Sequence, residues 1–241
     1  MGGFVASIVE GEDFNSFYGG YFEKDGNGNI VTDADGFPVI AAENGVTGSA
    51  QPDFRAGLGA SITKGPWDFS FVFETSQGNE MWAGTYSVLH YFGIHPNTAV
   101  ESVAPQDLPK YAGGFGGTVP AGTTFRGNIG DFGGGLVALE EGWYRTDGGG
   151  FGSQDELFIF DASFIKLREV SLSYDLPSSI LTPIGAKGGS FGITGRNFLL
   201  QTDFPDIDPE ISLVGAGKAR GVEYFTNPNT ESFLFNLKLN F

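Results

Sequence analysis

The stretch FRAGLGASITKGPWDFSFVFET, residues 54 to 75, decides the fold class of this chain. From Phe54 to Ile62, apolar side chains occupy every second position, and small or charged residues occupy the positions between them. After a short turn at residues 64–66, a second run alternates aromatic and mostly polar side chains from Trp67 to Phe73. Alternation of this kind is typical of strands with one apolar face. Two such runs joined by a short Gly-Pro turn predict a β-hairpin.

The same alternation recurs on both sides of this hairpin, whereas helical periodicity is nearly absent. Residues 93–156 and 201–230 are long and loop-like, and loops of this length are uncommon in compact soluble domains. We expect further strands at residues 81–92, 163–176, 189–200 and 231–241, and a weaker hairpin formed by residues 15–23 and 29–40.

Strands of about ten residues, joined by short turns on one side and long loops on the other, describe an outer-membrane β-barrel. In lipid every backbone amide must be paired, so strands persist there only in a closed barrel. The fold class we expect is therefore all-β, with about seven or eight antiparallel strands of a transmembrane β-barrel and long extracellular loops. Its apolar strand faces would point to lipid and its polar faces to the interior.

The composition limits the classes of function. The chain has 241 residues, a formal net charge of −16 and a pI of about 4.3. This acidity argues against nucleic acid as a partner, because phosphate binding needs a basic surface. The absence of cysteine excludes a disulfide scaffold and a thiolate metal site. Phe, with 24 copies, is the dominant aromatic residue, and aromatic residues favour strands and membrane interfaces.

Four blocks of the sequence are more specific than the alternation alone. In their order along the chain, they resemble the late-barrel signature of SusC/RagA-type TonB-linked (TonB-dependent) outer-membrane transporters. The blocks are PDFRAGLGASITKGPWDFSF at 52–71, FDASFIKLREVSLSYDLP at 160–177, GRNFLLQTDFPDIDPEIS at 195–212 and GVEYFTNPNTESFLFNLKLNF at 221–241.

The resemblance implies a plugged transporter barrel of about 22 strands. Residues 1–241 would form a C-terminal part of the barrel domain, without the plug and the N-terminal strands. Met1 is followed by Gly-Gly-Phe with no basic start and no apolar segment, so we expect no signal peptide, in agreement with such a fragment. The implied location is the outer membrane of a Gram-negative, Bacteroidetes-like cell.

The resemblance also implies a function and partners. The chain would be part of a TonB-dependent importer of oligosaccharides or peptides, and it would not be an enzyme. The expected partners are a SusD-like lipoprotein, TonB through the missing N-terminal region, the barrel-insertion machinery, outer-membrane lipid, and a glycan or peptide substrate. No nucleic acid is expected among them.

The last strand fits the same resemblance. Such a strand, with a final aromatic residue, resembles the signal that the insertion machinery reads in outer-membrane barrels, and it places an aromatic side chain at the periplasmic interface. We therefore predict a C-terminal insertion signal formed by Phe233, Phe235, Leu237, Leu239 and Phe241.

No catalytic, cofactor or metal site is expected. His90 and His95 are the only histidines, and no nucleophile elbow accompanies them. The segment KDGNGNIVTDADG, residues 24–36, alternates acidic and amide side chains as an EF-hand loop does. Ile30 and Gly36, however, stand where that loop needs a glycine and a glutamate. We interpret the segment as turns that join two strands.

Ligand contacts are expected from aromatic and arginine side chains. Sugar rings stack on flat aromatic faces, and the arginine fork makes bidentate polar contacts. Girdles at the membrane interfaces and contacts to a docked lid use the same residue types, so both readings stay open. The candidates for ligand contact are Trp82, Tyr86, Trp143, Tyr144, Arg145 and Arg196.

Two other classes of function remain open. A free-standing secreted β-sandwich binding module, like a lectin or adhesin, would use the same alternation with its apolar face inward. An enzyme on a β-scaffold would depend on the two histidines. The orientation of Phe69, Phe71, Phe235 and Leu237 discriminates between a sandwich and a barrel, because a sandwich buries them in a dry interior between two layers.

Overall fold

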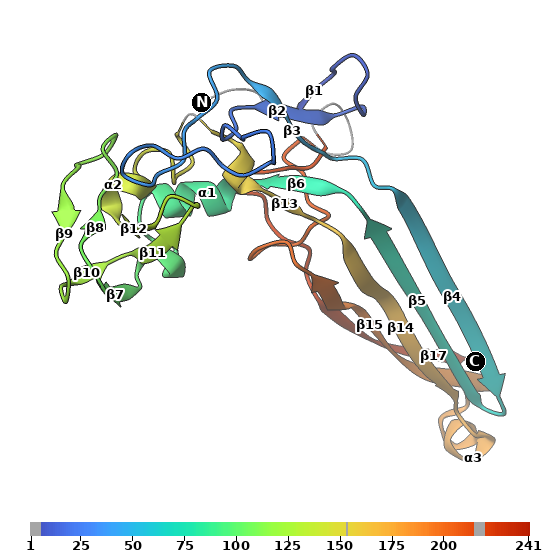
Figure 1. The fold of residues 1–241 in the computed structure, drawn as a ribbon. Coiled ribbons are helices and arrows are strands. Elements are labelled where there is room, and N and C mark those ends of the chain that lie inside the picture. Colours follow the sequence, from blue (N-terminus) through green and yellow to red (C-terminus); the bar gives the residue numbers. More distant parts are fainter. Residues whose placement is uncertain (1–5, 153, 215–219) are drawn as a thin grey trace. The chain divides into compact units, whose positions relative to one another are not determined.

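The computed structural model describes residues 6–152, 154–214 and 220–241, and β-strands dominate its regular structure (Figure 1). The chain divides into two compact units. Unit 1 comprises residues 1–51, 80–161 and 205–226, and unit 2 comprises residues 52–79, 162–204 and 227–241. Within the described ranges, no helix is long and apolar enough to span a membrane.

Unit 2 is an antiparallel sheet of five long strands in the order β17-β15-β14-β5-β4 (Figure 1). α3 (Ser178–Leu181) and a 3-10 turn (Thr182–Ile184) connect β14 to β15. The strands are β4 (Phe54–Lys64), β5 (Trp67–Gln77), β14 (Phe164–Asp175), β15 (Gly188–Thr202) and β17 (Ser232–Asn240). The all-β, antiparallel fold class is confirmed, and within this chain the sheet is open, with β4 and β17 at its edges.

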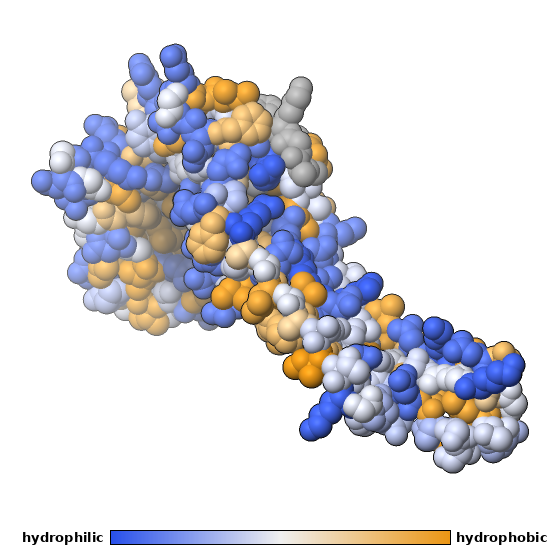
Figure 2. Space-filling view, turned by 90° about the vertical axis from the view of Figure 1, so that its right-hand side faces the viewer, coloured by the Kyte–Doolittle hydropathy of each residue, from blue (hydrophilic) through white to orange (hydrophobic). Residues whose placement is uncertain are grey.

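The register of unit 2 gathers its apolar side chains on one face. A row of directly paired residues crosses all five strands at Ile62, Phe69, Leu172, Ile193 and Phe235. These five side chains are between 38% and 69% exposed, and Figure 2 shows hydrophobic side chains at the surface of the long strands. A sandwich would bury this row in a dry core. The exposure therefore favours the barrel interpretation over the sandwich.

The opposite face of the same sheet is polar. Ser70 of β5 pairs with Ser171 of β14, whose hydroxyl lies 2.7 Å from that of Thr194 on β15. Two ion pairs join neighbouring strands on the polar side: Arg168 Nε lies 2.7 Å from Glu74, and Arg196 Nε lies 2.8 Å from Glu169.

A β-bulge in β14 explains why Lys166 and Arg168 stand at positions of the same parity as the apolar Val170 in the sequence. The register shifts between Leu167 and Glu169, and a bulge of this kind adds one residue to its strand and reverses the alternation beyond it. Leu167 therefore pairs with Phe73 in the apolar rows, while Lys166 pairs with Glu74.

Unit 1 consists of short strands and two short helices, α1 (Gly84–Tyr91) and α2 (Glu141–Tyr144). One three-stranded sheet of unit 1 consists of β1 (Ala6–Ser7), β2 (Ser16–Gly19) and β3 (Gly45–Ser49). A second three-stranded sheet consists of β13 (Ile159–Asp161), β6 (Glu80–Ala83) and β16 (Val222–Glu223). Three pairs complete unit 1: β7 (Glu101–Val103) with β10 (Thr124–Arg126), β8 (Leu108–Pro109) with β9 (Thr118–Val119), and β11 (Asn128–Asp131) with β12 (Leu136–Leu139). Two 3-10 turns cover Pro96–Thr98 and Glu156–Phe158.

The strand expected at residues 81–92 is wrong beyond its first residues. β6 ends at Ala83, and the chain continues as the helix α1. The carboxylate of Glu223, which is fully buried, accepts hydrogen bonds from the backbone N–H of Thr85 at 3.0 Å and from its hydroxyl at 2.5 Å. A carboxylate at the first turn satisfies N–H groups that have no partner inside the helix. This distant cap overrides the strand preference of the local sequence.

Aspartate-centred turns shape much of unit 1. The Oδ1 atom of Asp25 accepts the N–H groups two and four residues later, at 2.8 and 2.9 Å, and Asp33 and Asp131 repeat this pattern. Each carboxylate thus accepts hydrogen bonds from backbone N–H groups of its own turn. This agrees with the interpretation of residues 24–36 as turns. The hairpin expected around this segment is present only as isolated bridges, including Phe22 with Ile40, whereas β2 pairs with β1 and β3.

Candidate functional site

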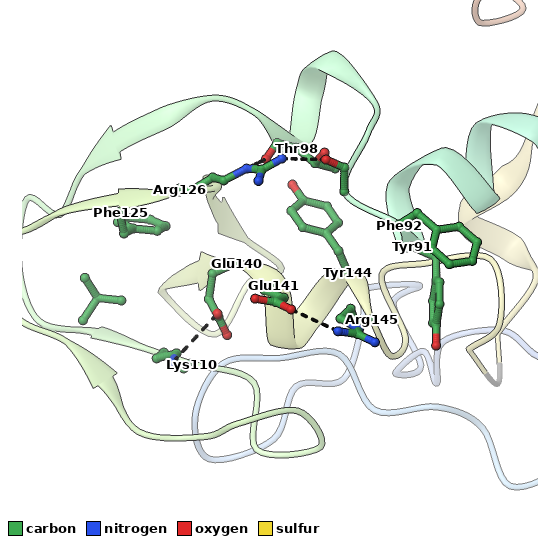
Figure 3. A pocket seen from close by; sticks show the side chains of 12 residues that line it. Tyr91, Phe92, Thr98, Lys110, Phe125, Arg126, Glu140, Glu141, Tyr144 and Arg145 are labelled. Atoms are coloured by element: carbon green, nitrogen blue, oxygen red, sulfur yellow. Dashed lines mark hydrogen bonds and ion pairs between the residues drawn. The ribbon is translucent and has the colours of Figure 1, made fainter.

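A pocket of about 510 Å³ lies within unit 1 (Figure 3). The elements around it are the end of α1, the strand β10, the residues that follow β12, and α2. Its aromatic lining consists of Tyr91, Phe92, Phe125 and Tyr144, and its charged lining consists of Lys110, Arg126, Glu140, Glu141 and Arg145. A cavity of this size accommodates a ligand of a few sugar or amino-acid residues.

An aromatic core holds the pocket wall in place. Trp143 is 3% exposed and packs 5.6 Å from Phe37 and 5.2 Å from Tyr111, measured between ring centroids. Gly148 and Gly149 follow α2, and a Cβ on Gly149 would lie 1.9 Å from the carbonyl oxygen of Tyr144. The glycines that follow α2 therefore allow the chain to pack closely against α2.

Two of the three cations in the pocket face a carboxylate. Lys110 Nζ lies 3.9 Å from Glu140, and Arg145 Nη1 lies 3.2 Å from Glu141. Arg126 instead donates to two backbone carbonyls, from Nε to Thr98 at 3.0 Å and from Nη2 to Gly93 at 2.6 Å. Among the described residues, no ion pair with a carboxylate is formed by Arg126, although Glu101 of β7 is its cross-strand neighbour outside the pocket lining. Arg126 is therefore the cation of the lining that has no carboxylate of the lining as a partner.

The hydroxyl of Tyr144 is the second polar group at this end of the pocket. It accepts a hydrogen bond from Asn128 Nδ2 at 2.8 Å, and Figure 3 shows it pointing toward Arg126. Burial raises the pKa of Tyr144 above its ordinary value of 10.0. The group therefore stays protonated at neutral pH, and its O–H is available as a donor.

Only two of the six residues predicted to contact a ligand, Tyr144 and Arg145, line this pocket. Trp143 supports the wall from the core, and its burial argues against direct ligand contact. Trp82 packs on another core cluster of unit 1 and stacks on Tyr224 at 6.1 Å. Arg196 lies in unit 2, in its ion pair with Glu169.

Tyr86 belongs to a separate cluster with the two histidines. Its ring lies 4.1 Å from that of His90 and 4.7 Å from that of His95, and the histidine rings stack at 4.2 Å. His90 Nδ1 lies 2.8 Å from the carbonyl oxygen of Tyr86, and His95 Nε2 lies 2.7 Å from Asp206. Burial lowers the pKa of His90 below 6.5. These contacts position the histidines as packing and hydrogen-bonding groups.

The C-terminal strand carries the residues of the predicted insertion signal. Phe233, Phe235 and Leu237 are more than 60% exposed on the apolar face of β17, and Phe241 follows the strand. Their role as a signal stays a prediction.

The sequence interpretation missed Lys110, Arg126, Phe125 and the two glutamates of the pocket. One signal was available in the sequence. The stretch 93–156 contains three basic residues, Lys110, Arg126 and Arg145, in a chain of net charge −16, and the fold brings all three to one cavity.

The chain is similar to two curated proteins of Formosa agariphila. It is 24% identical to TonB-dependent receptor P3 over 265 residues, which cover 97% of this chain and 23% of the relative. It is 26% identical to TonB-dependent receptor P26 over 234 residues, which cover 92% of this chain and 19% of the relative. The chain thus spans about a quarter or less of the length of these relatives. No protein-family model matches it.

Solved structures show the same fold. The RagAB peptide importer in its open-open state matches 99% of this chain and 24% of its own, with a TM-score of 0.55 and 16% identity. Another structure of the RagAB peptide transporter matches 93% of this chain and 23% of its own, with a TM-score of 0.51 and 19% identity. The expected location in the outer membrane of a Bacteroidetes-like cell is confirmed by these relatives. In sequence and in fold, the chain is therefore a relative of the SusC/RagA-type TonB-dependent transporters.

Proposed function

We propose that this chain forms part of the barrel wall and the extracellular loops of a TonB-dependent importer of oligosaccharides or peptides. One observation carries the proposal: the exposed apolar face that runs across all five strands of unit 2. Exposure of such an apolar face to water is unfavourable, whereas contact of the face with lipid is favourable. The polar opposite face, with its hydroxyl row and ion pairs, suits an aqueous interior.

The proposal includes the organisation of the whole protein and its partners. Residues 1–241 would be a partial barrel domain without the plug and the N-terminal strands. The partners would be a SusD-like lipoprotein, TonB through the region that this chain lacks, the barrel-insertion machinery and outer-membrane lipid. The transported substrate would be a glycan or a peptide, and the protein would not act as an enzyme.

The pocket of unit 1 supports the loop part of this proposal. It combines aromatic surfaces with charged groups, as sites for short oligosaccharides or peptides do. Trp82, Tyr86 and Arg196 lie outside the pocket lining, so any ligand contact that they make would belong to another part of the binding surface.

The experiment compares arginine substitutions on the two faces of one strand. In the protein expressed from its own gene, Phe71→Arg places a charge on the apolar face, and Ser70→Arg places it on the polar face. A lipid-facing arginine costs about 2–4 kcal/mol near the bilayer midplane. Phe71→Arg should therefore deplete the protein from isolated outer membranes, while Ser70→Arg should leave its amount near that of the wild type. Equal amounts of the two variants in the outer membrane would refute the proposed orientation.

A further inference from the structure

The pocket lining of unit 1 contains one cation, Arg126, that forms no ion pair with a carboxylate of the lining; its cross-strand neighbour Glu101 is exposed on β7, outside the lining. Three cations and two carboxylates line the pocket, so its lining carries a net charge of +1 within a chain of net charge −16. Glu140 and Glu141 face Lys110 and Arg145. Within the lining, the cation left over by these two ion pairs is Arg126.

The guanidinium of Arg126 is held in place and still has free donors. Its hydrogen bonds to the carbonyls of Thr98 and Gly93 use two of its five N–H groups and fix the plane of the guanidinium. The other N–H groups have no partner among the described residues. A fixed, weakly hydrated guanidinium with free donors is well suited to bind an oxyanion.

Tyr144 adds a second donor at the same end of the pocket. Asn128 supplies a hydrogen bond to the Tyr144 oxygen, so the O–H hydrogen is free to be donated to a ligand. Figure 3 shows the hydroxyl pointing toward Arg126, and Phe125, which precedes Arg126 on β10, also lines the pocket. Two donors from different residues match the two oxygens of a carboxylate, and the aromatic rings match an apolar or ring-shaped body.

From this geometry we propose that the pocket binds a carboxylate-bearing ligand, with the carboxylate held by Arg126 and Tyr144 and the ligand body packed on Phe125. The inference deepens the proposed importer function by naming the ligand chemistry of this pocket. A carboxylate of this kind comes from two sources, the C-terminus of a short peptide or the uronate of an acidic oligosaccharide.

Calorimetric titration of the purified protein in detergent tests the proposal with matched pairs of probes. The tripeptide Ala-Phe-Ala is compared with its C-terminal amide, and trigalacturonate is compared with its methyl ester. At least one acid should bind about 10- to 100-fold more tightly than its neutral partner, as expected for charge-assisted hydrogen bonds. The pair that shows the difference identifies the source of the carboxylate, and equal binding within both pairs would overturn the proposal.

Variants assign the effect to the two donors. Arg126→Gln should remove the preference for the acid, and Arg126→Lys, which keeps the charge, should retain part of it. Tyr144→Phe keeps the ring in its core position and should weaken binding of the acid several-fold, with little change for the neutral analogue. The control Lys24→Gln removes a cation of unit 1 that lies outside the pocket and pairs with Glu156. It should leave the preference intact.

If Arg126→Gln does not fold, the binding preferences of Arg126→Lys and Tyr144→Phe test the assignment instead. A preference for the acid that persists in every variant would overturn the assignment. The result of the binding experiment is independent of that of the membrane experiment. If the protein binds the acid selectively while Phe71→Arg and Ser70→Arg reach the outer membrane in equal amounts, the ligand assignment of the pocket stands and the proposed importer function is refuted.

Discussion

Removal of the Glu223 carboxylate should open the helix α1 from a position 138 residues away along the chain. Glu223 is fully buried, and its two oxygens accept hydrogen bonds from the backbone N–H and the hydroxyl of Thr85. The residue before the helix, Ala83, has no side chain that can cap it. Glu223→Ala therefore leaves the first turn of α1 with an unsatisfied N–H.

The size of the effect follows from these contacts. Each hydrogen bond to a charged group contributes about 1.5–3 kcal/mol, and a carboxylate near a helix N-terminus adds about 0.3–1 kcal/mol. Relief of the cost of burying the carboxylate offsets part of this sum. We expect a net loss of about 2–4 kcal/mol in the local free energy of opening, which corresponds to about 30- to 900-fold faster exchange of the protected α1 amides.

Hydrogen exchange of the full chain in detergent, read by mass spectrometry on peptides that cover residues 84–92, measures this change. Glu43→Ala is the matched control, because it removes the same charge from an exposed position of unit 1. Thr85→Ala in the Glu223→Ala background should add little, since the two residues share one interaction. If Glu223→Ala exchanges no faster than Glu43→Ala, the distant cap does not hold the helix, and our account of why residues 84–91 are helical is wrong.

Three further outcomes are expected. Gly149→Ala should destabilise unit 1 by about 1–3 kcal/mol, because its Cβ would meet the Tyr144 carbonyl oxygen, whereas Gly26→Ala, which has open space around it, should cost little in the same denaturant unfolding assay. Burial lowers the pKa of His90 below 6.5, so the native state favours the neutral ring. The contribution of His90 to the stability of unit 1 should therefore be fully present above pH 6.5 and should be lost progressively as the pH falls below that value. The free energy of unfolding measured from pH 5 to 8 should show this slope in the wild type and a smaller slope in His90→Gln, and equal slopes would contradict the prediction. Glu74→Gln breaks a partly exposed ion pair with Arg168 and should change the free energy of unfolding in detergent by no more than about 1 kcal/mol. A loss of several kcal/mol would show that the ion pair is far better shielded from solvent than its exposure indicates.

The sequence by itself determined the strands of unit 2 and which of their faces is apolar. The alternation from Phe54 to Phe73 and from Phe233 to Leu239 has a period of two, and that period is a local property of an extended chain. Since a slip of one residue would exchange the two faces, the same pattern also specifies how the strands pair. The order of four sequence blocks was enough to indicate the family to which the chain is similar.

Only the tertiary structure decided the helix α1, the bulge in β14 and the pocket. Residues 84–91 have the composition of a strand, and the group that caps them, Glu223, arrives from the distant strand β16. Lys110, Arg126 and Arg145 are separated by loops and short strands, and no periodicity relates them. Their convergence depends on the pairing of short strands and the packing of Trp143, which are contacts between residues far apart in the chain, and a local pattern carries no information about such contacts.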